Sequence, residues 1–418
     1  MKKLQQLWLL LLWLPLAALA SSEQDNSLSV ERMWQLERIG SPVASADGKF
    51  IVAPVTRFDV KADQGHTRLW LFDDKGQQRP LTADGMRASE ATFSPDGKTL
   101  AFISQRNKDE AGQIYLLPLT TPGEAQRLTE VPTGVYGIKW VGEHLYFISR
   151  VWPGKNWEEM AAELKANKDK KVSAWQWNAL PYSQFDHWID ENRQAHVFRI
   201  PAKGGEVEPV TQKFGRELPR SSQSASSYDV HPQERLIAFN TNGSDNTVDP
   251  KIDIFLAAIG SEQADNITPD NQAPDSNPKF SPDGKSLAFS RQKIHGFYAD
   301  TAKLTIYDLA KKTSRELASN WDRSVSNFVW TADSRGFYSS IDDAATQLHV
   351  FLAHAGGQVD REHQVAPNLW RCDGGTELLR ARGRDAKQAP REEGQPREPA
   401  RRRCDRGRAG DALQAIAP

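Results

Sequence analysis

Four residues near the middle of the chain have the types that most often bind metal ions. They are Asp186, His187, Asp190 and His196. Imidazole and carboxylate groups are good zinc ligands, but the spacing of these four fits no common ligand pattern. Trp188, which lies among them, and Phe198, two positions after His196, favour a packed strand and turn. We therefore expect neither a metal ion nor another cofactor in this protein.

A nucleophilic serine would need a special turn or a neighbouring base. Hydrolases that use serine on an α/β scaffold place it in a Gly-x-Ser-x-Gly turn, which exposes the hydroxyl at the corner between a strand and a helix. No such turn occurs in the sequence. The serine-rich stretch 221–227 has no adjacent base, so we expect a polar loop there. We predict that this chain contains no catalytic residue.

Glu158 and Glu159 are adjacent acids at the start of a predicted helix. Apolar residues recur at spacings of three and four within 152–171, and Asn156 is a suitable N-cap. Acidic side chains in the first turn stabilise a helix through its dipole. Two neighbouring carboxylates are also suited, by charge and hydrogen bonding, to hold a cation. Both interpretations are open at this point.

The elements that position these residues follow from a five-residue turn motif that recurs along the chain. Proline presets φ at the first turn position, aspartate favours the next, and glycine accepts a positive φ without steric cost. Aliphatic, aromatic or β-branched residues follow each copy, as a buried strand requires. Three clear copies and three weaker ones are centred on Asp47, Asp96, Glu143, Gln233, Asp283 and Asp333.

The spacing of the copies predicts a β-propeller. They recur about every 50 residues, and a third and a fourth strand follow each, which is typical of a four-stranded propeller blade. A solenoid or a pair of sandwiches would not repeat one turn so regularly. We therefore predict an all-β fold in which residues 41–367 form six repeat units of an incomplete ring. The one longer interval predicts a helical insertion at 152–180.

The insertion and the N-terminal segment resemble a known family. The insertion has a Trp-Pro-Gly start at 152–154, a charged helix, and an Asp-x-Trp-x-Asp segment before a His-containing strand. These features look like the propellers of bacterial acylaminoacyl and dipeptidyl peptidases, which are members of the prolyl oligopeptidase family. Residues 29–40 resemble the helix before that family's first blade, so we expect an N-terminal helical segment within 21–40. The turn repeats alone are shared with TolB-type periplasmic propellers.

The resemblance implies a two-domain serine peptidase. In that family a propeller covers an α/β-hydrolase domain with a Ser, Asp and His triad, and it filters peptide substrates by size. Its dipeptidyl peptidases hold the substrate's ammonium with two Glu on a propeller helix, which makes Glu158 and Glu159 the candidate substrate-binding residues. We expect a truncated peptidase that keeps the gating propeller and lacks the hydrolase domain. The alternative is a non-catalytic TolB-like propeller that binds proteins.

The last segment, 368–418, differs from the rest of the chain. It has eleven Arg and one Lys, and it has no Phe, Tyr or Val. Arg, Ala, Gly and Pro are all encoded by GC-rich codons. We therefore expect that a frameshift near residue 367 replaced the hydrolase domain with out-of-frame sequence. A genuine disordered basic tail is the alternative.

The first residues predict export. Lys2 and Lys3 precede an apolar run at 7–16, and a small-x-small cleavage site ends at Ala20, as in a secretory signal peptide. The run is shorter than the roughly 20 residues that a membrane span needs. We expect a signal peptide at 1–20, a periplasmic or secreted protein, and no stable membrane anchor. The formal net charge of −1 predicts no nucleic-acid partner.

Overall fold

The computed structural model describes residues 27–360 except for a small number of positions. These positions are 107, 122, 173, 175, 179, 191, 221, 245, 326, 344, 345 and 355–358. The expected signal peptide at 1–20 and the Arg-rich segment at 368–418 lie outside the described residues. Within the described part of the chain, no helix is long and apolar enough to cross a membrane.

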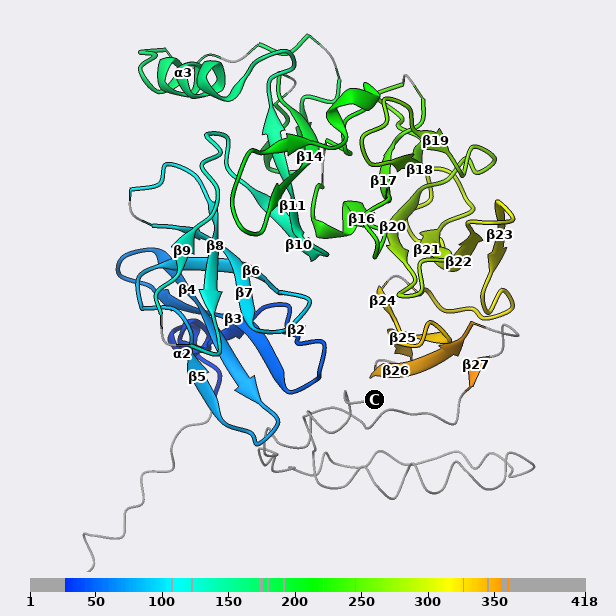
Figure 1. Cartoon of the computed structure of the whole chain (residues 1–418), viewed down its shortest axis with the longest axis horizontal. Coiled ribbons are helices and arrows are strands. Elements are labelled where there is room, and N and C mark those ends of the chain that lie inside the picture. The colour runs from blue at the N-terminus through cyan, green and yellow to red at the C-terminus, as the bar shows by residue number, and fades with distance from the viewer. Residues whose placement is uncertain are drawn as a thin grey trace, which may run out of the picture.

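Six antiparallel sheets follow one another along the chain (Figure 1), and each copy of the turn motif joins two successive strands of one sheet. The predicted all-β propeller of four-stranded blades is therefore confirmed. Blade 1 contains β1 (Arg38–Ile39), β2 (Val43–Ala44), β3 (Phe50–Asp59), β4 (Gln64–Asp73) and β5 (Gln78–Pro80). Blade 2 contains β6 (Arg87–Phe93), β7 (Thr99–Gln105), β8 (Gln113–Pro118) and β9 (Gln126–Arg127). Blade 3 contains β10 (Tyr136–Val141), β11 (His144–Val151), β14 (Gln194–Pro201) and β15 (Glu208–Pro209).

The second half of the propeller has the same strand order in each sheet. Blade 4 contains β16 (Tyr228–Val230), β17 (Leu236–Asn242), β18 (Ile252–Ala258) and β19 (Asp265–Asn266). Blade 5 contains β20 (Asp275–Phe280), β21 (Ser286–Arg291), β22 (Lys303–Asp308) and β23 (Thr313–Glu316). Blade 6 contains β24 (Asn327–Trp330), β25 (Gly336–Asp343), β26 (Thr346–Ala353) and β27 (Val359–Asp360). Two 3-10 turns, η1 (Gln212–Phe214) and η2 (Ala225–Ser227), connect blade 3 to blade 4.

The turn motif is held together by its own side chains. In blade 2, Ser94 Oγ donates to Asp96 Oδ1 at 2.6 Å. Asp96 Oδ1 also accepts from the amide of Lys98 at 3.1 Å. Gly97 has a φ of +69°, a conformation that favours a residue without Cβ. The same hydroxyl-to-aspartate bond starts at Ser45, Ser281 and Thr331. These turns all lie at one end of the blades, which we call the turn face.

Consecutive blades pack face to face through hydrophobic clusters. Between blades 1 and 2, Val52 and Leu71 pack with Leu100 and Phe102. Equivalent clusters join blades 2 and 3, blades 3 and 4, blades 4 and 5, and blades 5 and 6. Among the described residues, no such cluster joins blade 6 to blade 1. Burial of these apolar side chains is the main stabilising contribution to the fold.

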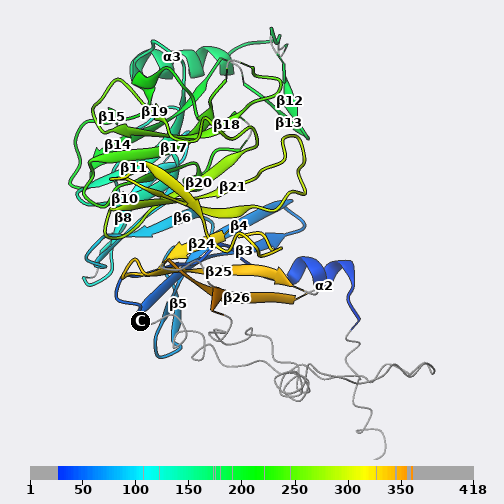
Figure 2. The ribbon, with the colours of Figure 1, turned by 90° about the vertical axis from the view of Figure 1, so that its right-hand side faces the viewer.

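The insertion leaves blade 3 between its second and third strands. Its helix, α3 (Trp157–Lys168), lies along the outside of the blade (Figure 1) and buries Met160. A two-stranded hairpin follows, formed by β12 (Ser183–Gln184) and β13 (His187–Trp188). Figure 2 shows that this hairpin and the N-terminal helix α2 (Val30–Gln35) project on the same side of the propeller.

Candidate functional site

The loops between the second and third strands of the blades lie opposite the turn face, on the side that carries α2 and the β12–β13 hairpin (Figure 2). We call this side the loop face. Most of the exposed large apolar side chains of the described chain belong to it. They are Leu28, Val30, Met33, Leu36, Val60, Val172, Leu180, Tyr182, Phe185, Trp188, Val248, Ile294, Phe297 and Tyr298. Apolar side chains gathered on one side of a protein mark an interaction surface.

The β12–β13 hairpin presents aromatic rings to solvent. The ring centroids of Trp177 and Trp188 are 5.0 Å apart, and that of Tyr182 lies 6.1 Å from Trp188. Trp177 Nε1 donates to the carbonyl of Ile189 at 2.6 Å, which fixes the base of the hairpin. Phe185 is 95% exposed at the tip, where its φ of +51° is unusual for a bulky residue. The chain therefore holds an apolar side chain in solvent at a cost in backbone strain.

The hairpin is connected to the loops of the next two blades. Thr247 Oγ1, in the loop after β17, donates to the carbonyl of Leu180 at 2.9 Å. In the same loop, Asp249 Oδ2 lies 2.9 Å from Nε2 of His295, which belongs to the loop after β21. These polar contacts link the insertion to blades 4 and 5. The exposed rings therefore belong to one connected set of loops.

Glu158 and Glu159 lie in the first turn of α3, where both side chains are exposed. Glu159 Oε2 accepts from the amide of Asn156 at 2.8 Å, and Asn156 Oδ1 accepts from the amide of Glu159 at 2.9 Å. This reciprocal pair is a capping box. The carboxylate of Glu159 therefore stabilises the start of α3, whereas Glu158 points into solvent. The assignment of these two acids to substrate binding stays a prediction.

The four residues considered as metal ligands have separate surroundings. Asp186 and His187 form an exposed pair at 3.3 Å near the hairpin tip, and Asp190 Oδ2 accepts from Arg193 Nε at 2.5 Å. His196 is buried inside blade 3, and burial lowers its pKa to about 4. The described residues contain no group of three or more His, Cys, Asp or Glu suited to a metal ion.

The described serines between 222 and 227 form a structural turn. Ser224 caps η2, because its Oγ accepts from the amide of Ser226 at 3.3 Å. Ser227 Oγ accepts from the amide of Ser224 at 3.1 Å. Their hydroxyl groups are therefore used by the neighbouring backbone, as the sequence-based expectation of a polar loop implies.

A set of charged side chains on the innermost strands joins successive blades, and the sequence analysis missed it. The amides of Gly137 and Ile138 in blade 3 donate to Glu90 Oε2 in blade 2, at 2.5 and 3.3 Å. Lys139 Nζ donates to the carbonyl of Tyr228 at 2.7 Å and to Asp229 Oδ1 at 2.6 Å, both in blade 4. Each link runs from one blade to the next.

The series continues through blades 4, 5 and 6. Asp229 Oδ2 accepts from the amide of Phe280 at 2.7 Å, and Lys279 Nζ donates to the carbonyl of Phe328 at 2.5 Å. Burial lowers the pKa of Lys279 to about 8, and the charge of Lys139 adds to this effect. We call Glu90, Lys139, Asp229 and Lys279 the inter-blade links. They alternate between acid and base along the ring.

The sequence does contain a signal for three of these links. Lys139, Asp229 and Lys279 each lie four residues before the residue on which their copy of the turn motif is centred. In blade 6 the same position is Val329, whose side chain is 62% exposed. In blade 2 a register shift between Ser89 and Ala91 places Glu90, at a φ of +43°, where it reaches blade 3. Only an alignment of the six repeats would reveal this pattern.

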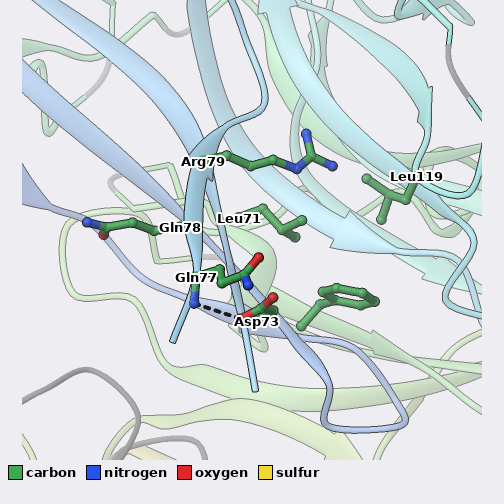
Figure 3. Close-up of a pocket in the computed structure, with 7 residues that line it drawn as sticks. Leu71, Asp73, Gln77, Gln78, Arg79 and Leu119 are labelled. Atoms are coloured by element: carbon green, nitrogen blue, oxygen red, sulfur yellow. Dashed lines mark hydrogen bonds between the residues drawn. The ribbon is translucent and has the colours of Figure 1, made fainter. Parts of the chain in front are cut away.

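One surface cavity lies on the turn face, away from the aromatic hairpin (Figure 3). Its volume is about 200 Å³, and Phe50, Leu71 and Leu119 supply its apolar wall. Asp73 Oδ1 accepts from the amide of Gln77 at 2.7 Å, so this carboxylate holds the β4–β5 turn. The cavity therefore lies beside a turn, and Gln78 and Arg79 supply the rest of its polar lining.

Comparison with known proteins finds similarity to the propeller-containing halves of peptidases, although no model of a protein family matches the chain. The dipeptidyl-peptidase 5 of Porphyromonas gingivalis is 25% identical over 330 residues, which cover 76% of this chain and 47% of that protein. The dipeptidyl-peptidase 5 of Aspergillus fumigatus is 23% identical over 376 residues, which cover 82% of this chain and 51% of that protein. The chain thus spans about half the length of the curated relatives that it matches.

Solved structures show the same fold. The acylaminoacyl peptidase of Pyrococcus horikoshii is similar with a TM-score of 0.56 and 15% identity, covering 82% of this chain and 48% of that one. The β-propeller domain of the Trilobed protease from Pyrococcus furiosus, described as having an open velcro topology, has a TM-score of 0.52 and 14% identity. That match covers 80% of this chain and 85% of the other. The resemblance to propellers of prolyl-oligopeptidase-type peptidases is confirmed.

Proposed function

We propose that this chain, a β-propeller similar to those of prolyl-oligopeptidase-type peptidases, is the substrate-gating portion of an exported serine peptidase that acts on short peptides. The match to the dipeptidyl-peptidases 5 carries this proposal, because it covers 76% of the chain, far more than one shared turn motif would. The matched part is about half of each relative. We place the catalytic triad in the other half, because this sequence has no Gly-x-Ser-x-Gly turn.

In this proposal the loop face is the surface that meets the catalytic domain and the peptide. It exposes Phe185, Trp188 and Tyr298, and an isolated propeller would hold these rings in water. Burial against a partner domain would remove their apolar surface from solvent, which stabilises the contact by about 25 cal/mol per Å². Glu158 and Glu159, at the start of α3, remain the proposed binders of the peptide's ammonium group.

We also propose that a signal peptide at 1–20 directs export and that a frameshift near residue 367 removed the catalytic half. Both rest on the sequence composition of segments outside the described residues. A fluorophosphonate probe, which labels activated serines, tests the absence of catalysis in this chain. We expect no labelling of the purified chain under conditions that label the dipeptidyl-peptidase 5 of P. gingivalis. Labelling of this chain would contradict the proposal.

A further inference from the structure

The turn of blade 4 differs from other copies of the turn motif at its first position. In those copies a hydroxyl donates to the aspartate two residues later, and they begin at Ser45, Ser94, Ser281 and Thr331. Blade 4 has His231 at this position, and Gln233 replaces the aspartate. The backbone turn is the same, because the amide of His231 donates to the carbonyl of Leu236 at 3.0 Å. An imidazole therefore replaces a hydroxyl without a change in the hairpin.

The ring of His231 reaches the turn of the next blade. His231 is 1% exposed, and its Nε2 lies 2.9 Å from the carbonyl oxygen of Gly284, the glycine of the turn motif in blade 5. A Cβ on Gly284 would lie 2.4 Å from Nε2, so the absence of a side chain there allows this approach. The ring also packs edge-on against Phe280, with centroids 5.4 Å apart. We call these contacts between blades 4 and 5 the His231 joint.

The neutral form of the imidazole fits this joint. The amide of Gln233 donates to Nδ1 at 3.1 Å, so Nδ1 is an acceptor. A neutral imidazole has one N–H and one acceptor nitrogen. With its proton on Nε2, the ring donates to the carbonyl of Gly284 and accepts from Gln233 at the same time. A neutral His231 therefore satisfies both turns.

A second proton on the ring has no acceptor in this arrangement. It would lie on Nδ1 and face the N–H of Gln233. The imidazolium would also lie beside the guanidinium of Arg235, whose Nε is 3.0 Å from Nε2, and like charges repel each other. Burial lowers the pKa of His231 and the charge of Arg235 adds to this effect, whereas the hydrogen bond to Gly284 opposes it. Protonation therefore works against the joint.

The other charged groups near the ring are engaged elsewhere. Asp283 and Lys285, in the facing turn of blade 5, form an exposed pair with each other at 3.5 Å. Glu234 turns toward blade 3, where its Oε1 lies 2.8 Å from Nδ1 of His144. Within the described part of the chain, no carboxylate bonds to either ring nitrogen of His231. The imidazolium would therefore lack a compensating charge.

We propose that His231 is a pH-sensitive switch at the turn face, which joins blades 4 and 5 when its ring is neutral and releases them when its ring is protonated. Histidine is the side chain whose charge normally changes between about pH 5 and pH 8. The unfolded chain binds the proton more readily than the folded chain, so stability from the joint is fully present above about pH 6.5, the ordinary pKa of histidine, and is lost as the pH falls.

The release is local to the turn-face end of the two blades. Asp229 continues to accept from the amide of Phe280 at 2.7 Å, and the apolar cluster between blades 4 and 5 is unaffected by protonation. Acid therefore frees the two turns without unfolding the sheets. This switch requires no catalytic domain, so its failure and a failure of the proposed peptidase role are distinguishable.

A variant that restores the common motif tests the switch. His231→Ser combined with Gln233→Asp gives blade 4 the hydroxyl-to-aspartate turn of the other blades, so we expect it to fold. As the pH is lowered from about 7.5 to about 5, the urea midpoint of the original chain should fall relative to that of this double variant. His187→Ser is the matched control, because His187 is exposed on the β12–β13 hairpin. It should show the same pH dependence as the original chain.

Hydrogen exchange of the original chain distinguishes release of the joint from general acid destabilisation. The turn at 94–99 is the internal reference, because it has the same motif without histidine and experiences the same chemical exchange conditions. Relative to this reference, amides at 231–236 and 281–286 should exchange about tenfold faster at about pH 5 than at about pH 7.5.

The same ratio in the double variant should not change with pH. A ratio that is independent of pH in the original chain would overturn the proposal, and so would an equal change in both proteins. Nuclear magnetic resonance of labelled histidine gives a test without any variant. If the ring of His231 titrated at the same pH in the folded chain and in the urea-unfolded chain, the proposal would also be wrong.

Discussion

Lys139 Nζ lies 2.6 Å from Asp229 Oδ1, although 90 positions separate the two residues and they belong to different blades. The pair is largely buried, with 21% of the lysine and 18% of the aspartate side chain exposed. Asp229 uses its other oxygen for the amide of Phe280 in blade 5. One carboxylate therefore joins three consecutive blades near the centre of the ring.

This relationship predicts a large effect of removing either partner. Breaking a buried ion pair by truncating one side costs about 3–5 kcal/mol, because the other charge is left unpaired. We expect Lys139→Met and Asp229→Asn each to lower the free energy of unfolding by about 3 kcal/mol or slightly less, given the residual exposure. Urea unfolding followed by circular dichroism measures this change.

A double-mutant cycle and a surface pair provide the controls. The combined Lys139→Met and Asp229→Asn variant should lose less stability than the sum of the single variants, because the two side chains interact directly. Lys49 and Asp47 form an exposed pair, and Lys49→Met should change stability by less than about 0.5 kcal/mol. Strict additivity of the two central substitutions would show that the buried pair does not couple the blades.

Lys279 predicts a pH dependence of stability with a definite sign. Its pKa is about 8 in the folded chain because of burial, below the ordinary value of 10.5 that applies to the unfolded chain. Between these two values the unfolded state binds more protons than the folded state, so stability from this group rises as the pH increases from about 8 to about 10.5.

The difference between the original chain and Lys279→Met isolates this group from other titrations. We expect urea midpoints of the two proteins to diverge between pH 8 and pH 10.5, with the original chain gaining stability relative to the variant. If the difference between the two urea midpoints stayed constant from pH 8 to pH 10.5, the ammonium of Lys279 would not be buried against Phe328.

The capping box of α3 predicts separate roles for the neighbouring acids. Asn156→Ala removes the side-chain cap and should cost about 1 kcal/mol of stability. Glu158→Gln should leave stability unchanged, because Glu158 is exposed. If the proposed ammonium binding is correct, Glu158→Gln weakens binding of trialanine with a free N-terminus but not that of trialanine with an acetylated N-terminus. If the original chain and Glu158→Gln bound the peptide with a free N-terminus equally well, Glu158 would have no role in ammonium binding.

The exposed rings of the loop face predict a change in surface behaviour without a change in folding. Phe185 and Trp188 are 95% and 68% exposed, and Trp188 also packs on Trp177 and Tyr182, so replacing both with serine should lower the free energy of unfolding by only about 1 kcal/mol or less. Binding of the fluorescent dye ANS and self-association in sedimentation should both decrease. A large drop in Tm would mean that these rings support the fold.

The propeller architecture could be predicted from the sequence because the turn motif depends only on neighbouring residues. Ser94, Asp96 and Gly97 lie within four positions, and their chemistry sets a hairpin without help from distant residues. The regular recurrence of that hairpin then determines the propeller. The helix of the insertion was also predictable, since Asn156 and the spacing of apolar residues define its start and its buried side.

The features that sequence analysis missed depend on contacts between distant residues. Glu90 reaches blade 3 only because of a register shift in β6, and no local sequence pattern predicts that shift. The hairpin at 183–188 has no Gly at its turn and instead places Phe185 at a positive φ.

The gene sequence after codon 367 tests most directly the proposal that this chain is the propeller of an interrupted peptidase. We predict that one of the other two forward reading frames encodes a Gly-x-Ser-x-Gly turn followed by an Asp and later a His, in the chain order of an α/β-hydrolase. A region with no such frame would contradict the account, and it would favour a propeller that works by binding alone.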